Sequence, residues 1–247
     1  MTTAKNRTRL DVLIFERGLA PSREKAQAMI LAGEVVVNGA IAAKSGQAVA
    51  RDAAVEIYSR MQKYVSRGGF KLEGALRDFR VDASGRICLD LGSSNGGFTD
   101  CLLQHGAARL YAVDVNVDQL DWKLRQDSRV MAIKKNAREM QSGDLPEMVN
   151  LVAADVSFIS VTKILPAVAP LAAPGADFLI LVKPQFELHR QDVGPGGIVR
   201  ESELHQRAIE SVRSALTELD LAAVGVKPSQ LPGAEGNQEF FLHARKV

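Results

Sequence analysis

The chain has 247 residues, of which 46% are hydrophobic and 24% are charged, and its two cysteines and four histidines follow no ligand spacing. These values indicate an ordinary globular protein and argue against a disulfide framework or a zinc site, so we expect no bound metal. No apolar stretch approaches the roughly 20 residues that span a bilayer, and no leader pattern opens the chain. We therefore expect a cytoplasmic protein without a membrane partner.

Charge is unevenly distributed along the chain. The formal net charge is +2, but residues 1–71 hold 12 lysines and arginines against 6 acidic residues, whereas the remainder holds 19 against 23. The basic excess of the N-terminal part indicates an anionic partner. A solvated basic surface without a partner is the alternative.

The N-terminal part begins with two predicted helices. Leu10 and Ile14 lie at helical spacing before Gly18, which predicts a short first helix. Ser22 is suited to cap a second helix that Gly33 ends. Basic residues lie in and around both helices.

A small sheet is predicted to follow the helices. Residues 35–37 are three valines, and Asn38-Gly39 behind them is the dipeptide that most strongly indicates a tight hairpin. Residues 55–58 read as a closing strand. We expect residues 1–60 to form a small α+β domain.

This domain resembles the RNA-binding domain named after ribosomal protein S4. The matching segments are Arg9-Leu10-Asp11, Ser22-Arg23-Glu24-Lys25-Ala26 and Gly33-Glu34-Val35-Val36-Val37-Asn38-Gly39. The resemblance implies docking on structured RNA through the basic helix pair, and a generic helix-hairpin packing module is the alternative. The RNA-binding candidates are Arg9, Arg17, Arg23, Lys25 and Arg67.

Behind a linker and leading helix at residues 61–82, the pattern alternates strands with helices. Five buried strand-like runs lie at residues 87–91, 110–115, 151–156, 178–182 and 239–243. This alternation predicts a doubly wound, mostly parallel α/β sheet, which is a Rossmann-like fold, over residues 83–247.

A glycine-rich loop after the first of these strands indicates a cofactor site. Its glycines are spaced G-x-x-x-G-G, which differs from the dinucleotide fingerprint G-x-G-x-x-G, and the lysine and hydroxyl that end a P-loop are lacking. Asp114 ends the next strand, where an acidic side chain can bind ribose hydroxyls. The candidate cofactor residues are Asp90, Gly92, Ser93, Gly96, Gly97, Phe98 and Asp114. Asp90, the loop and Asp114 resemble the first two motifs of class I methyltransferases, and this resemblance implies S-adenosylmethionine as cofactor.

Four ionisable residues are expected at the ends of secondary-structure elements around this loop. Gly69-Phe70-Lys71-Leu72, Ala154-Asp155-Val156-Ser157-Phe158, Leu181-Val182-Lys183-Pro184 and Asn237-Gln238-Glu239-Phe240 resemble the Lys-Asp-Lys-Glu tetrad of FtsJ-like ribose 2′-O-methyltransferases. Two details depart from that pattern. Asn95 stands where proline is usual in the loop, and Val156-Ser157-Phe158 replaces Met-Ala-Pro.

Transfer of a methyl group to a ribose hydroxyl requires a positioned nucleophile and a group that accepts its proton. We assign proton acceptance to the neutral amine of Lys183. Asp155 and Glu239 then orient Lys183 and stabilise the ammonium that forms, while Lys71 holds the target ribose or its phosphate.

With Lys63-Tyr64-Val65-Ser66-Arg67-Gly68-Gly69 and Gly194-Pro195-Gly196-Gly197-Ile198-Val199-Arg200, the whole chain resembles the TlyA family, also called hemolysin A-like proteins. The resemblance implies 2′-O-methylation of cytidine in ribosomal RNA, with ribosomal subunits as partners. Two alternatives are a non-catalytic RNA-binding or ribosome-assembly factor and a membrane-active hemolysin.

Overall fold

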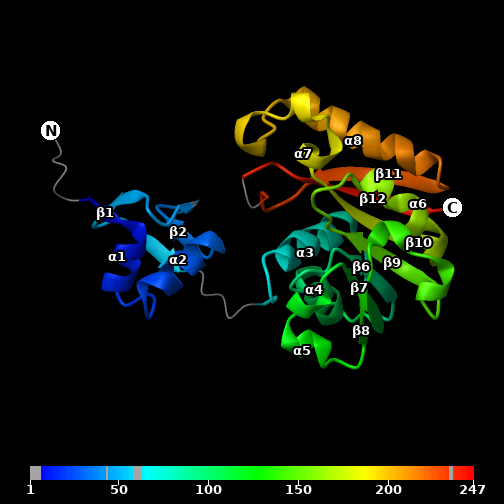
Figure 1. The fold of residues 1–247 in the computed structure, drawn as a ribbon, viewed down its shortest axis with the longest axis horizontal. Coiled ribbons are helices and arrows are strands. Elements are labelled where there is room, and N and C mark those ends of the chain that lie inside the picture. Colours follow the sequence, from blue (N-terminus) through cyan, green and yellow to red (C-terminus); the bar gives the residue numbers. More distant parts are fainter. Residues whose placement is uncertain (1–6, 43, 58–62, 234–235) are drawn as a thin grey trace. The chain divides into compact units, whose positions relative to one another are not determined.

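The computed structural model describes residues 7–42, 44–57, 63–233 and 236–247. The chain divides into two compact units, Met1–Lys63 and Tyr64–Val247 (Figure 1). Tyr58, expected to end the closing strand, and the expected domain boundary after residue 60 lie outside the described residues.

The N-terminal unit packs two short helices against short strands. Its elements are β1 (Arg7–Arg9), α1 (Leu10–Glu16), α2 (Arg23–Leu31), β2 (Val35–Val37), β3 (Ala40–Ile41), β4 (Ala48–Ala50) and β5 (Val55–Ile57). Leu10, Ile14 and Ile30 are almost fully buried and form its core with Val35. A small apolar cluster of this kind gives a unit of this size only modest stability.

Local chemistry explains the boundaries of these elements. The side chain of Ser22 accepts a hydrogen bond from Lys25 N at 3.1 Å, which confirms it as the cap of α2. Gly33 has φ +72° beyond the helix end, and Asn38 and Gly39 have φ +50° and +82° in the β2–β3 hairpin. The pairing of β1 with β4 was not predicted, because these three-residue strands carry no continuous apolar pattern.

The C-terminal unit is built around a seven-stranded sheet in the order β11-β12-β10-β9-β6-β7-β8. The strands are β6 (Ile87–Leu91), β7 (Arg109–Asp114), β8 (Val130–Lys134), β9 (Val149–Ala154), β10 (Ala172–Val182), β11 (Leu221–Pro228) and β12 (Phe240–Lys246). The five strands from β10 to β8 are parallel, and β12 runs antiparallel to both β10 and β11. The mostly parallel Rossmann-like sheet is thus confirmed.

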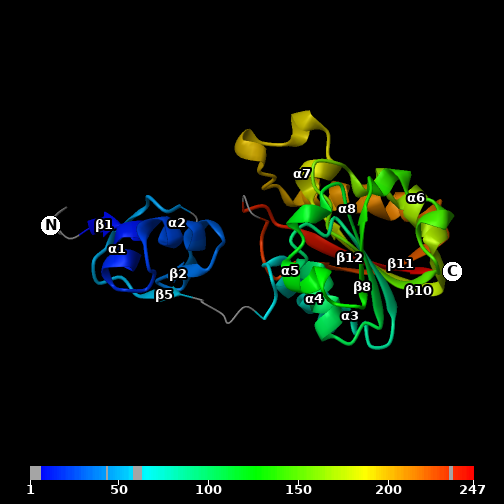
Figure 2. The same cartoon turned by 60° about the horizontal axis from the view of Figure 1, so that its bottom comes forward.

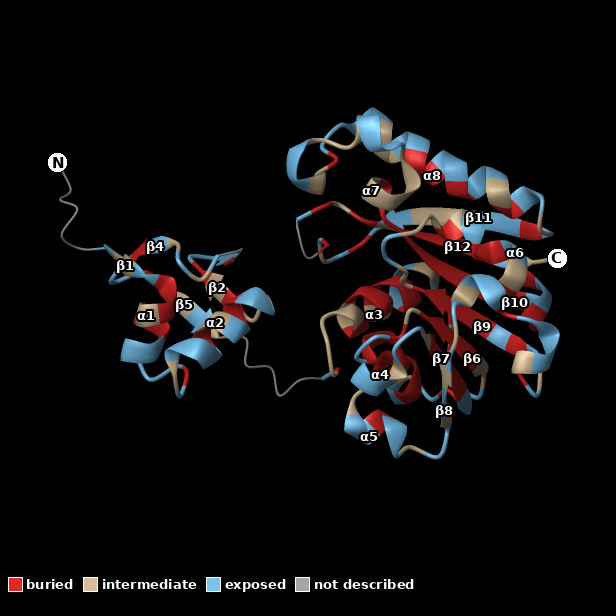
Figure 3. Cartoon of the chain, viewed as in Figure 1, coloured by how far each residue is buried: buried red, intermediate tan, exposed pale blue. Residues whose placement is uncertain are grey.

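Helices cover both faces of this sheet (Figures 1 and 2). The helices are α3 (Gly68–Phe79), α4 (Gly97–Gln104), α5 (Trp122–Arg125), α6 (Leu165–Val168), α7 (Pro184–Glu187) and α8 (Ser202–Thr217). Along β9, Leu151 and Ala153 pack in the core that includes α3 and α4, whereas Val152 and Ala154 pack in the core that includes α6 and α8. The sheet is accordingly buried between the helices (Figure 3).

The edge strands β8 and β11 were missed by the sequence pattern. Residues of β8 are exposed or half-buried throughout, and most of β11 is exposed or half-buried as well, so neither strand carries a buried apolar run. Within the described ranges, no helix is long and apolar enough to cross a membrane. The same ranges hold no cluster of three or more residues suited to bind a metal ion.

Candidate active site

The register of the sheet places the predicted catalytic residues at one edge. Val182 lies opposite Phe240 in the antiparallel pair of β10 and β12, so Lys183 follows one strand where Glu239 precedes the other. Ala154 is paired both with Ile180 of β10 and with Leu91 of β6. Asp155 therefore leaves β9 between Lys183 and the glycine loop, as expected at the carboxyl ends of parallel strands.

Lys183 is held by two oxygen atoms. Its Nζ lies 2.5 Å from Asp155 Oδ1 and donates a hydrogen bond to Ser157 Oγ at 2.8 Å. Lys183 as a whole residue is 8% exposed. An amine fixed in this way has a defined direction, which a group that moves a proton to or from a substrate needs.

Lys71 and Glu239 form a second pair. Lys71 projects from α3 and its Nζ lies 2.5 Å from Glu239 Oε2, with both residues buried. A Cβ at Gly233 would lie 2.6 Å from Glu239 Oε1, so the loop before β12 wraps closely around this carboxylate. The four tetrad residues thus occur as two lysine-carboxylate pairs at the ends of neighbouring elements.

The three glycines of the predicted cofactor loop are in contact with protein. A Cβ at Gly92 would lie 2.3 Å from Asp155 O, one at Gly96 would lie 2.2 Å from Leu124 Cδ1, and one at Gly97 would lie 2.2 Å from Ser66 Oγ. Gly92 and Gly96 also have φ +78° and +95°. Close packing of the loop therefore requires glycine at all three positions, and the backbone conformation requires it at Gly92 and Gly96 as well.

Asp90 and Ser93 present polar atoms beneath the loop that lack partners. Thr99 donates a hydrogen bond to Asp90 Oδ2 at 2.6 Å, but Asp90 Oδ1 and Ser93 Oγ are buried without a hydrogen bond in the described part of the chain. Burial, aided by the negative charges of Asp155 and Asp114, raises the pKa of Asp90 to about 7, against the effect of the Thr99 hydrogen bond. Buried polar atoms are normally satisfied. Their position therefore fits a polar ligand with hydrogen-bonding groups, such as the predicted cofactor.

Asp114 and Phe98 differ in what they offer to a ligand. Asp114 accepts hydrogen bonds from Ser94 N at 3.0 Å and Asn116 N at 2.9 Å, which leaves further lone pairs on its oxygens. Phe98 is 3% exposed and its ring lies 6.1 Å from that of Phe241 in the core. The structure gives Phe98 a packing role below the loop.

Three of the predicted RNA-binding arginines form ion pairs or hydrogen bonds within the N-terminal unit. Arg9 and Arg23 both bind the buried carboxylate of Asp11, at 2.9 and 3.3 Å. The hydrogen bond from Arg9, despite burial and with further hydrogen bonds from Gln27 and Arg23, lowers the pKa of Asp11. Arg17 donates to the carbonyl oxygens of Ala53 and Arg51.

The other two candidates lie in different surroundings. Lys25 is exposed in the first turn of α2. Arg67 belongs to the C-terminal unit, where its guanidinium donates to Pro232 O at 3.1 Å. Arg67 therefore contacts the loop that leads to Glu239 and does not belong to the basic helix pair.

Sequence reasoning missed several residues near the tetrad. Phe158 is 91% exposed, adopts φ +65° and has its ring 5.4 Å from that of Phe186. A bulky residue in the left-handed region is strained, so an exposed phenylalanine there indicates a role other than packing. Asp100 of α4 accepts a hydrogen bond from Val65 N at 2.8 Å, which connects the segment before α3 to α4. No spacing rule identifies these residues, because each depends on a long-range contact or a backbone angle.

Comparison with known proteins agrees with this geometry. The FtsJ-like methyltransferase family model matches residues 64–246, and the S4 domain model matches residues 8–55. The chain is 45% identical to YqxC of Bacillus subtilis, covering 98% of this chain and 86% of that protein. It is 44% identical to the 16S/23S rRNA (cytidine-2′-O)-methyltransferase TlyA of Mycobacterium tuberculosis, covering 97% of this chain and 90% of that one.

Two further matches carry another name. Hemolysin A of Brachyspira hyodysenteriae is 40% identical, with 95% of this chain and 98% of the relative covered. A solved structure of a hemolysin-named protein from Streptococcus thermophilus has 40% identity and a TM-score of 0.77, covering 99% of this chain and 90% of that chain. The chain therefore belongs to the FtsJ-like methyltransferases, and within them to the TlyA, or hemolysin A-like, family.

Proposed function

We propose that this protein is an S-adenosylmethionine-dependent methyltransferase that modifies the ribose 2′-hydroxyl of cytidine in ribosomal RNA. The observation that carries the proposal is that two lysine-carboxylate pairs, of which three members are buried and Asp155 is half-buried, lie at the sheet edge beside the glycine loop. Its relative in M. tuberculosis carries the corresponding name.

The loop between β6 and α4 holds the cofactor in this proposal. Asp90 Oδ1 and Ser93 Oγ offer their unused hydrogen-bonding capacity, and Asp114 binds the ribose hydroxyls of the adenosine. Bound S-adenosylmethionine supplies an electrophilic methyl group. The glycines contribute by letting the loop close against Asp155 and Leu124.

Lys183 accepts the proton of the target hydroxyl. Asp155 and Ser157 fix the direction of its amine and stabilise the ammonium that it becomes. Lys71, paired with Glu239, holds the ribose or its phosphate. Positioning of this kind provides a large part of the rate enhancement when the protein itself makes no covalent bond.

Phe158 offers a surface for a nucleobase. It follows Ser157 directly, and with Phe186 it forms an aromatic pair on the segments that leave Asp155 and Lys183. Stacking of a base on an aromatic side chain is worth about 1–3 kcal/mol. We assign Phe158 to stacking on the target base or its neighbour.

The N-terminal unit docks the enzyme on RNA. Lys25 is exposed, and about half of the side-chain surface of Arg9 and of Arg23 remains exposed despite their pairing with Asp11. Guanidinium groups already oriented by a carboxylate can still donate to phosphate. A ribosomal RNA substrate also implies that the protein works where ribosomes are assembled, in the cytoplasm.

The non-catalytic and membrane-active alternatives receive less support. A binding factor has no need of two largely buried lysine-carboxylate pairs beside a loop with unsatisfied polar atoms, since such groups cost stability. The support for a membrane-active hemolysin comes from the names of relatives.

The test is methyl transfer from labelled S-adenosylmethionine to unmodified ribosomal subunits and to naked ribosomal RNA, followed by mapping of the labelled position. We expect label at the 2′-oxygen of a cytidine. Label on a base, or cofactor binding with no transfer to either substrate, would contradict the proposal.

A further inference from the structure

Residues 188–200, which we name the arm, connect α7 to α8 at the catalytic edge. The arm begins five residues after Lys183 and, drawn in yellow, stands out from the body of the C-terminal unit in Figure 2. The proposed function gives it no role. Its two ends are nevertheless fixed to the segments that carry the tetrad.

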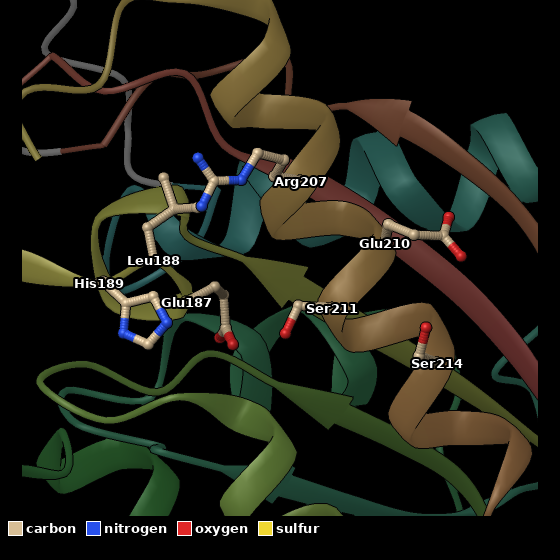
Figure 4. Close-up of a pocket in the computed structure, with 7 residues that line it drawn as sticks. All are labelled: Glu187, Leu188, His189, Arg207, Glu210, Ser211 and Ser214. Atoms are coloured by element: carbon tan, nitrogen blue, oxygen red, sulfur yellow. The ribbon is translucent and has the colours of Figure 1, made fainter. Parts of the chain in front are cut away.

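The start of the arm is fixed through Glu187. Its carboxylate accepts hydrogen bonds from Ser160 Oγ and from Val161 N, both on the segment that follows Asp155. Asp192, farther along the arm, pairs with Arg207 of α8 at 2.9 Å. A cleft of about 350 Å³ separates the start of the arm from α8 (Figure 4). Because Arg207 is engaged by Asp192 there, we assign this cleft no ligand.

The returning end is fixed by Asn237, which is 1% exposed. Its Nδ2 donates to Gly197 O at 2.8 Å, and its Oδ1 accepts from Val199 N at 2.9 Å. Asn237 lies two residues before Glu239. One buried amide therefore joins the end of the arm to the loop that carries a tetrad carboxylate.

Arg200 follows this anchored end. It is exposed, and it has no hydrogen bond or ion pair with any residue of the described ranges. Arg67, at the start of α3, contacts the loop that carries Asn237, through its hydrogen bond to Pro232 O. Two arginines from distant parts of the sequence are thus linked to the loop before Glu239, Arg67 through its own hydrogen bond and Arg200 through the neighbouring Val199. Glu201 and Glu203, beside Arg200, are exposed and form no ion pair among the described residues.

A ribose that is modified at this edge brings its flanking phosphates with it. Phosphates are bound chiefly by arginine and lysine, which fix the register of the strand without reading its sequence. We propose that the arm is a second RNA-contact surface, on which Arg200 binds the phosphate backbone next to the modified ribose and the buried amide of Asn237 holds Arg200 in place. This inference rests on the proposed function.

The first test compares Arg200→Ala with Arg213→Ala. Arg213 is an exposed arginine of α8, about 17 Å along the helix from its start. Arg213→Ala therefore removes the same positive charge at a position away from the arm. We expect Arg200→Ala to raise KM for ribosomal RNA about tenfold. The slope of log affinity against log salt concentration should fall by about the value of one phosphate contact. The kcat, the affinity for S-adenosylmethionine and the melting temperature should stay unchanged, and Arg213→Ala should match the wild type. Arg200→Lys should recover part of the loss.

The second test asks whether Asn237 acts through Arg200. In the Asn237→Ala background, Arg200→Ala should raise KM less than twofold, because an arm without its anchor no longer presents the arginine. Full additivity of the two substitutions would overturn the positioning role. A merely structural role of Asn237 would lower the melting temperature and leave the effect of Arg200→Ala intact.

Direct RNA binding, measured without turnover, separates this inference from the proposed function. If the wild type binds ribosomal RNA and Arg200→Ala binds equally well, the arm is no RNA surface, whether or not methylation occurs. An effect of Arg200→Ala on assembled subunits but not on naked RNA would point to a ribosomal protein as the partner and would also overturn it. Absence of methylation by the wild type, with the binding difference preserved, would contradict the proposed function alone.

Discussion

Two buried carboxylates of the same sheet have opposite surroundings. Asp177, at the start of the parallel stretch of β10, is bound by Arg86 Nη1 at 2.6 Å, His243 Nε2 at 2.7 Å and Arg245 Nε at 3.1 Å. Asp90, near the end of β6, accepts a hydrogen bond from the Thr99 hydroxyl, and its Oδ1 has no hydrogen-bond partner among the described residues.

The pKa values follow from these partners. Burial acts to raise both, but the hydrogen bonds from His243, Arg86 and Arg245 lower the pKa of Asp177, whereas the pKa of Asp90 rises to about 7. A carboxylate whose partners are all supplied by the fold stabilises the fold. One that keeps an unsatisfied oxygen costs stability and is available to a ligand.

The largest effect should come from the catalytic edge. Lys183→Ala should lower methyl transfer about 10³-fold, with RNA and cofactor affinity retained, because the proton acceptor is lost while both binding surfaces remain. Lys183→Arg should be as inactive, since arginine keeps the charge but does not give up its proton. Single-turnover rates measure both variants. Substantial activity in Lys183→Arg would show that charge, rather than proton acceptance, is what the site needs.

At the other end of the sheet, Asp177→Asn should lower the free energy of unfolding by about 3 kcal/mol, because the hydrogen bonds from Arg86, His243 and Arg245 lose their charged acceptor. The folded-state pKa of Asp177 is depressed. Its stabilising contribution is therefore present above the unfolded pKa of about 4 and disappears as pH falls through the lower folded value. Urea unfolding at several pH values measures this, with specific activity of the folded fraction as control. A variant that keeps its stability but loses methyl transfer would show that Asp177 serves the reaction rather than the fold.

Asp90→Asn should act in the opposite direction on stability. Because folding raises the pKa of Asp90 to about 7, the folded state binds more protons between about pH 4 and 7, and the free energy of unfolding falls as pH rises through that range. Removing the charge should stabilise the cofactor-free protein by on the order of 2 kcal/mol at pH 8 and weaken cofactor binding at least tenfold. Thermal melts and calorimetric titration provide the two readouts. Lower stability together with full cofactor affinity would assign Asp90 to the fold.

The smallest effect is expected at Phe158. Glycine adopts φ +65° without strain, so Phe158→Gly should raise the free energy of unfolding by about 1 kcal/mol. The same change should raise KM for RNA, whereas Phe158→Tyr should preserve it. Unchanged KM in the glycine variant would remove the stacking role.

The sequence predicted the parts of this molecule that depend on local pattern. The buried strand Ile87–Leu91, the cap Ser22 and the hairpin at Asn38-Gly39 have signals within a few residues. The edge strands β8 and β11 lack a buried apolar run, and their pairing is set by distant segments.

The same limit applies to the candidate site. The order of Lys71, Asp155, Lys183 and Glu239 is visible in the sequence, but their division into two pairs follows from the register of β10 and β12 and the placement of α3. The ion pair between Arg9 and Asp11 was also not predicted. The sequence does not distinguish an arginine that binds a neighbouring carboxylate from one that binds RNA.

Transfer of a methyl group to a ribose oxygen at the catalytic edge can be measured by alkaline hydrolysis of ribosomal RNA that has been labelled from S-adenosylmethionine by the wild type and by Lys183→Ala in parallel. We predict label in an alkali-resistant dinucleotide that begins with cytidine for the wild type, and no label for the variant. Label in ordinary mononucleotides would contradict transfer to a ribose oxygen, and equal labelling by both proteins would contradict the role of Lys183.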